Sequence, residues 1–76
     1  MRDEKLIRMA NQIAAFFVSQ PGTASEGVAA HINDNWSPPM RAALLAHVAG
    51  GGAGLALAVV EAAPRLRPPP ARAAKA

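Results

Sequence analysis

The sequence predicts a small all-α fold, a bundle of three to four short helices with an extended Pro-rich C-terminal tail. Three observations indicate it: apolar residues recur with a helical period near the start, capping residues and prolines open the next segments, and proline and basic residues dominate the end. With 76 residues and no cysteine, the chain has room for one domain without disulfides or thiolate metal sites. We expect a helical domain over residues 1–63 and a basic tail over residues 64–76.

The clearest helix is expected over residues 3–20. At about 100° per residue, Leu6, Ala10, Ile13 and Phe17 fall within one narrow arc. Flanking apolar residues widen that sector to roughly 200°, about twice the stripe of an ordinary surface helix. Such a helix requires neighbours on two sides, and so short a chain hardly supplies both. A partner surface is therefore expected.

Two further helices are expected over residues 24–35 and 38–49. The first follows Thr23-Ala-Ser-Glu26, which matches a capping box. The second follows Ser37, a good N-cap, and has two prolines in its first turn, where a missing amide costs nothing. The glycines at 50–52 favour its end.

A fourth helix is expected over residues 53–63, ended by Pro64. The tail beyond it has four basic residues and no acidic one, whereas residues 1–63 have four basic and five acidic residues. Because the basic character belongs to the tail, the sequence argues against a nucleic-acid-binding fold, which would place its charge on a structured face. Pro68-Pro69-Pro70 favours a polyproline II conformation, and we expect the tail to be disordered in isolation.

The chain carries no convincing signal for secretion or membrane insertion. Asp3 and Glu4 interrupt the basic start that a signal peptide needs. Residues 42–60 lack formal charge and are long enough to span a bilayer, but His47 and three consecutive glycines interrupt them. We expect a soluble cytoplasmic protein.

No pattern of catalytic or metal-binding residues appears. His31, His47 and Asp34 are the plausible metal donors, but they match no known ligand spacing. Asp34 follows His31 by three residues, which suits a hydrogen bond on a helix. The hydroxyl residues fall at turns and helix starts, without a base beside them. We expect no catalytic, cofactor-binding or metal-binding residue in this chain.

The stretch HINDNWSPPMR, residues 31–41, favours a docking turn. Trp36 has two interpretations, a core residue packed with Phe17 and Leu44 or an interface anchor, and both can hold for different edges of its ring. Arg41 is either a solvated arginine or a partner for a carboxylate or phosphate. The predicted partner interface comprises Phe16, Phe17, His31, Trp36, Pro38, Pro39, Met40, Arg41 and His47.

Three ordered motifs give the chain a family resemblance. KLIRMANQIAAFF (residues 5–17), VAAHINDNWSPPMRAALLAHV (residues 28–48) and GGAGL (residues 51–55) resemble the small delta subunit of cytoplasmic NAD-dependent formate dehydrogenase. The basic tail matches nothing in that family. The resemblance implies a molybdenum- or tungsten-containing complex that oxidises formate and reduces NAD⁺. It places the molybdopterin guanine dinucleotide cofactor, iron–sulfur clusters and FMN in larger subunits.

The function implied is that of a non-catalytic accessory subunit. It would dock on the larger formate dehydrogenase subunits, foremost the catalytic alpha subunit, and support assembly, stability or cofactor maturation, without binding nucleic acid or membrane. Two alternatives stay open on the residues alone. One is a free-standing helical regulator, such as a homodimer joined by the first helix, and the other is a membrane-surface peptide that uses the basic tail.

Overall fold

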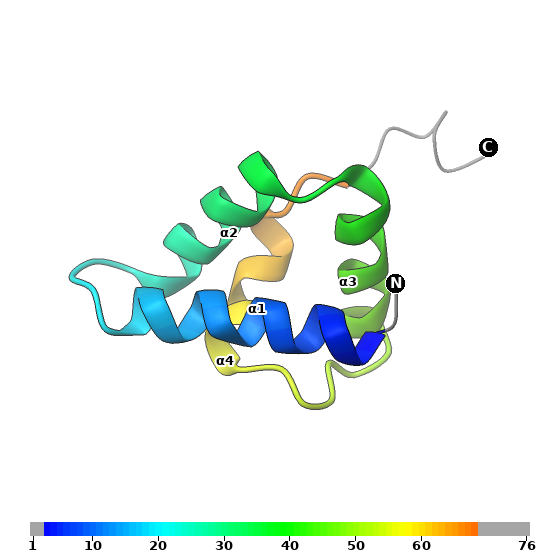
Figure 1. Cartoon of the computed structure of the whole chain (residues 1–76), viewed down its shortest axis with the longest axis horizontal. Helices are drawn as coiled ribbons and strands as arrows, with labels where there is room; N and C mark the ends of the chain where they lie inside the picture. Colours follow the sequence, from blue (N-terminus) through cyan, green and yellow to red (C-terminus); the bar gives the residue numbers. More distant parts are fainter. Residues whose placement is uncertain (1–2, 69–76) are drawn as a thin grey trace.

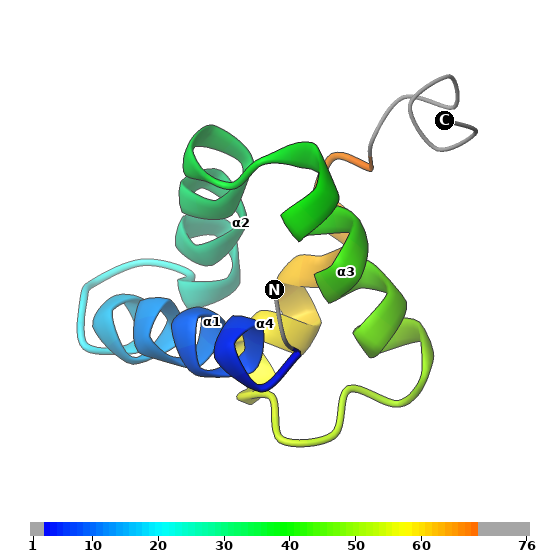
Figure 2. The same cartoon turned by 45° about the vertical axis from the view of Figure 1, so that its right-hand side comes forward.

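The computed structural model describes residues 3–68, and this part of the chain is all-α, as predicted (Figure 1). It contains α1 (Asp3–Val18), α2 (Ala24–Asn35), α3 (Pro38–Ala49) and α4 (Leu57–Ala62), followed by the 3₁₀ turn η1 (Ala63–Arg65). Helix α1 packs against the other three helices, and α2 also packs against α4. Figure 2 shows α2 and α3 on either side of α4, with α1 running across the lower part of the view. The disorder expected for the end of the tail concerns residues 69–76, which lie outside the described residues.

The first three helices begin where the sequence predicts. The bounds of α2 and α3 coincide with the expected ranges, and the Ser37 hydroxyl accepts a hydrogen bond from the Met40 amide at 3.4 Å. The expected capping box of α2 is wrong in detail, because Thr23 occupies the N-cap position without a side-chain capping bond. Helix α1 ends at Val18, two residues before the expected end, where the chain tightens into a turn.

The fourth helix begins at Leu57 rather than at residue 53. Gly51, Gly52 and Gly54 have φ angles of +120°, +67° and +81°, a region that residues with side chains rarely adopt. Asn11 of α1 then fixes the loop, because its amide donates to the Gly54 carbonyl at 2.9 Å and accepts from the Ala56 amide at 2.8 Å. Those two bonds fix the backbone of residues 54–56 in a non-helical conformation, so the helix starts only after them.

The core lies where α1, α2 and α4 meet. Five alanines within it let the helix backbones approach closely, and a few large side chains fill the remaining space. Ile32, Leu44, Val28 and Val59 are the largest fully buried side chains, and each stabilises the fold by about 1.5–3 kcal/mol. The buried cluster comprises Leu6, Ala10, Ala14, Val28, Ala29, Ile32, Trp36, Leu44, Ala58, Val59, Ala62 and Leu66.

The folded part of the chain extends beyond residue 63, where we expected the helical domain to end. Leu66 belongs to the buried cluster, and hydrogen bonds from α2 and α3 hold the backbone on either side of it. The expected tail boundary at Pro64 is therefore corrected to about residue 67. The prolines and arginines around Leu66 made the segment look like a solvent-exposed tail, although Leu66 packs in the core.

Candidate functional site

An apolar groove of about 500 Å³ lies beside the C-terminal half of α1 and the end of α2. Helix α1 supplies most of its lining, and α2 and the residue that follows it complete the wall. The lining residues are Met9, Gln12, Ile13, Phe16, Phe17, His31 and Trp36. A concave surface of this size with few polar groups is typical of a binding site.

The groove exists because only part of the apolar sector of α1 is buried. Leu6, Ala10 and Ala14, spaced by four residues, form the buried stripe. The larger apolar side chains lie beside that stripe on one side of the helix, at about 100° per residue. Phe16 is 58% exposed, and Met9, Ile13 and Phe17 are half-buried. The large apolar side chains of α1 beside the buried stripe therefore line the groove.

A close approach between α1 and α2 shapes the aromatic part of the groove. Gly27 of α2 faces the ring of Phe17, and a Cβ atom at that position would overlap the ring. The Phe17 ring in turn meets Phe16 edge to face, with centroids 5.0 Å apart, and lies 6.4 Å from the His31 ring. Because Gly27 lacks a side chain, Phe17 can rest against α2 while Phe16 remains exposed.

The lining of the groove contains no Asp, Glu, Lys or Arg residue. In the sequence, no such residue occurs between Arg8 and Glu26, the span that holds every lining residue of α1. Gln12 and His31 are the polar members of the lining. An apolar partner surface would fit here without desolvating an ion, the costliest step in forming an interface.

The structure brings together only part of the predicted interface. Phe16, Phe17, His31 and Trp36 line the groove, whereas the remaining predicted residues lie elsewhere. Trp36 is 5% exposed and belongs to the core cluster, so its ring contributes to both the core and the groove wall. In the turn that follows, Pro38 and Pro39 are exposed and Met40 is half-buried.

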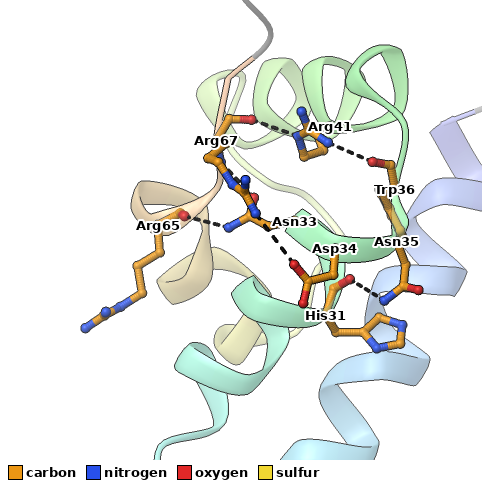
Figure 3. Close-up of polar contacts among 8 residues, drawn as sticks. All are labelled: His31, Asn33, Asp34, Asn35, Trp36, Arg41, Arg65 and Arg67. Atoms are coloured by element: carbon orange, nitrogen blue, oxygen red, sulfur yellow. Dashed lines mark hydrogen bonds and ion pairs between the residues drawn. The ribbon is translucent and has the colours of Figure 1, made fainter.

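Arg41 is bonded within the chain. Its Nη1 donates to the Trp36 carbonyl at 2.7 Å, and its Nε donates to the Arg67 carbonyl at 2.8 Å (Figure 3). The guanidinium thus joins the end of α2 to the C-terminal segment. These contacts assign Arg41 to holding the fold together, a role that the sequence did not suggest.

Two asparagines perform a similar task that sequence reasoning missed. Asn33 of α2 donates from its amide to the Arg65 carbonyl at 3.1 Å and accepts from the Arg67 amide at 2.8 Å (Figure 3). Asn11 makes the same pair of bonds to the carbonyl of Gly54 and the amide of Ala56. In each case one side chain satisfies the backbone of two residues spaced by two. Their signal in the sequence is faint, an amide residue within a helix.

The histidines do not assemble a metal site. His47 donates from Nε2 to the Ala53 carbonyl at 2.7 Å, which fixes the glycine-rich loop, whereas His31 lies at the groove. Asp34 pairs with Arg67 at 3.6 Å, and a hydrogen bond to His31 is not among its contacts within residues 3–68. No group of three or more His, Asp or Glu residues in the described part of the chain could hold a metal ion.

No helix within residues 3–68 combines the length and the hydropathy needed to cross a membrane. Nothing among the curated proteins matches the sequence. A family of known proteins does match it, over residues 5–63, and is described as the NADH-dependent formate dehydrogenase delta subunit FdsD. Because this match covers most of the chain, the protein belongs to the FdsD family of formate dehydrogenase delta subunits.

Proposed function

We propose that this chain is a non-catalytic accessory subunit that docks on a larger formate dehydrogenase subunit through the α1–α2 groove. Membership of the delta subunit family supplies the kind of partner, since a delta subunit associates with other subunits of its enzyme. The observation that carries the surface is the groove itself, which is apolar, has no Asp, Glu, Lys or Arg in its lining and is left open by residues 3–68. Exposed apolar surface with this composition is typical of protein interfaces.

The chemistry of formate oxidation, in which formate and NAD⁺ yield CO₂ and NADH, is assigned to the other subunits. Iron–sulfur clusters are held by cysteine thiolates, and this chain has no cysteine. The described residues also lack a cluster of His, Asp or Glu residues suited to a metal. This shortage of metal-ligating residues supports the proposal that the molybdopterin guanine dinucleotide cofactor, the iron–sulfur clusters and FMN are held in larger subunits. The complex is proposed to be cytoplasmic.

The catalytic alpha subunit is the proposed partner, and the proposed role is in assembly, stability or cofactor maturation. Phe16 and the adjoining aromatic residues form the centre of the docking surface. Pro38 and Pro39, exposed just after Trp36, extend it. Large aromatic side chains in a water-excluding centre commonly carry most of the binding free energy of an interface.

Replacing Phe16 with glutamate tests this surface. Phe16→Glu removes exposed apolar area and places a charge in the groove, so affinity for the other formate dehydrogenase subunits should fall at least tenfold, about 1.4 kcal/mol or more. Because the residue is exposed, helicity measured by circular dichroism should not change. Affinity is measured by interferometry on the purified subunits.

Leu57→Glu provides the matched control, since Leu57 is 71% exposed but lies on α4, away from the groove lining. Unchanged affinity for Leu57→Glu together with loss for Phe16→Glu supports the groove. The reverse pattern would move the interface to α4. Light scattering on the chain alone covers the alternative of a homodimer, since a stable dimer that Phe16→Glu dissociates would assign the groove to a second copy.

A further inference from the structure

The described part of the chain ends in a short segment, residues 65–67, that begins at the last residue of η1 and that α2 and α3 hold by its backbone. Asn33 bonds the Arg65 carbonyl and the Arg67 amide, and Arg41 bonds the Arg67 carbonyl. Leu66, between the two arginines, is buried. We call this arrangement, Asn33 and Arg41 with residues 65–67, the C-terminal clasp.

The clasp presents two arginines on a fixed backbone. Leu66 turns into the core, whereas Arg65 at the end of η1 and Arg67 after Leu66 lie at the surface. Both arginines are exposed, and in Figure 3 the Arg65 side chain extends away from the other residues drawn. All the hydrogen bonds of the clasp to this segment reach backbone atoms, so none of them engages a guanidinium group of Arg65 or Arg67.

The internal pairing of these arginines is weak. Arg67 contacts Asp34 at 3.6 Å, but the two side chains are 67% and 73% exposed, and a solvated pair of this kind contributes little. Within residues 3–68, Arg65 makes no ion pair. The sequence then adds Arg72 and Lys75, and residues 64–76 contain no acidic residue. The sequence therefore concentrates positive charge after residue 63, and within residues 3–68 the solvated Arg67–Asp34 pair is the ion pair that offsets it.

We infer that the clasp displays Arg65 and Arg67 as an electrostatic docking strip for an acidic surface on a larger formate dehydrogenase subunit. This inference rests on the proposed function and adds a second contact, distinct from the groove. Arginine forks pair with carboxylates in a defined geometry, and a fixed backbone reduces the entropy lost when they do so. A duplex nucleic acid would call for a larger basic surface than a net charge of +3 offers.

The two contacts depend differently on salt, and this difference tests the inference. Salt screens the attraction between exposed charges, whereas apolar contacts in the uncharged groove are not weakened by this screening. In the complex reconstituted from purified subunits, Arg65→Gln/Arg67→Gln should weaken binding about tenfold near 50 mM NaCl and little near 500 mM. The expected loss is mainly in the association rate, because oppositely charged surfaces accelerate encounter.

Lys5→Gln/Arg8→Gln is the matched control, because it removes the same charge from exposed positions on α1, outside the clasp. It should change affinity less than twofold. Equal losses in both variants would reduce the effect to net charge and overturn the strip, as would wild-type affinity of the Arg65→Gln/Arg67→Gln variant at low salt. Arginine-dependent sedimentation of the chain with phosphatidylserine vesicles, without an effect on subunit binding, would assign the strip to lipid and also overturn it.

Failure of the inference differs from failure of the proposed function. If the wild-type chain binds its partner with an affinity that does not change with salt, the strip is wrong and the groove stands. If the wild-type chain binds none of the other subunits at any salt concentration, the proposed function and the strip are both wrong.

Discussion

The two sides of α2 are completed in different ways. On the side of Asn33, side-chain amides bond the backbone of the C-terminal segment, and Leu66 closes the core. On the side of His31, the aromatic side chains of α1 and the ring of Trp36 border a groove that nothing within residues 3–68 fills. One helix thus separates a closed face from an open one.

This contrast distinguishes the face that the chain stabilises with its own contacts from the face that another surface must cover. The closed face uses directional bonds, each contributing about 1 kcal/mol, to hold segments too polar or too short to pack by apolar contact alone. The open face has apolar area and few directional groups, so it gains free energy only when another surface covers it. Changes on the closed face should therefore lower the stability of the chain, and changes on the open face should lower its affinity for a partner.

The largest expected effect follows from Trp36, which belongs to both faces. Trp36→Ala should destabilise the chain by about 3–5 kcal/mol, because it leaves a cavity in the core, and should also remove part of the groove wall. Urea unfolding followed by circular dichroism measures the loss. Trp36→Phe, which keeps an aromatic ring, should lose less than half of the free energy of unfolding that Trp36→Ala loses. A change below about 1 kcal/mol for Trp36→Ala would mean that the ring is not a core residue.

Asn33→Ala should separate the faces. It removes two hydrogen bonds and leaves the Arg65 carbonyl and the Arg67 amide without their partner, so the free energy of unfolding should fall by about 1–3 kcal/mol. Asn11→Ala should have a similar effect, and the two should add, because they bond different segments. At high salt, where the groove dominates binding, the affinity of folded Asn33→Ala should equal that of the wild type. An affinity loss as large as that of Phe16→Glu would contradict the separation.

A smaller effect on stability is expected for Gly27→Ala. Alanine raises the helix propensity by about 1 kcal/mol, but its Cβ displaces the Phe17 ring, so the two effects should largely cancel. The displaced ring should disturb the groove, weaken docking roughly fivefold and change the fluorescence of Trp36, the one tryptophan of the sequence. Adding Phe17→Leu should relieve the overlap. Unchanged fluorescence and affinity in Gly27→Ala would show that the position of the Phe17 ring does not shape the groove.

The sequence predicted the elements whose signals are local. Ser37 with two prolines placed the start of α3, and the period of α1 indicated more apolar surface than the chain covers. The start of α4 and the end of the folded part could not be predicted in this way. They depend on Asn11 and Asn33, whose bonding partners lie 32 to 45 residues away along the chain. The periodicity of a helical sequence does not indicate which distant backbone groups an asparagine side chain will bond.

The same limit applies to the candidate site. Phe16, Phe17, His31 and Trp36 were predicted as interface residues and share the groove lining, whereas the docking role of the turn at residues 36–41 stays a prediction. Arginine is a common interface residue, but the Arg41 guanidinium donates its hydrogen bonds to two carbonyl groups of its own chain. Only the tertiary fold distinguishes these two uses of a guanidinium.

The position of α4 has a consequence for the order of folding. A helix of six residues does not persist by itself, and asparagines from α1 and α2 hold the segments that precede and follow this one. Its backbone amides should therefore gain protection from hydrogen exchange only after α1 and α2 have formed. During synthesis on the ribosome, α1 and α2 emerge before the segment that contains α4. A nascent chain would therefore expose its aromatic groove before the C-terminal segment completes the fold.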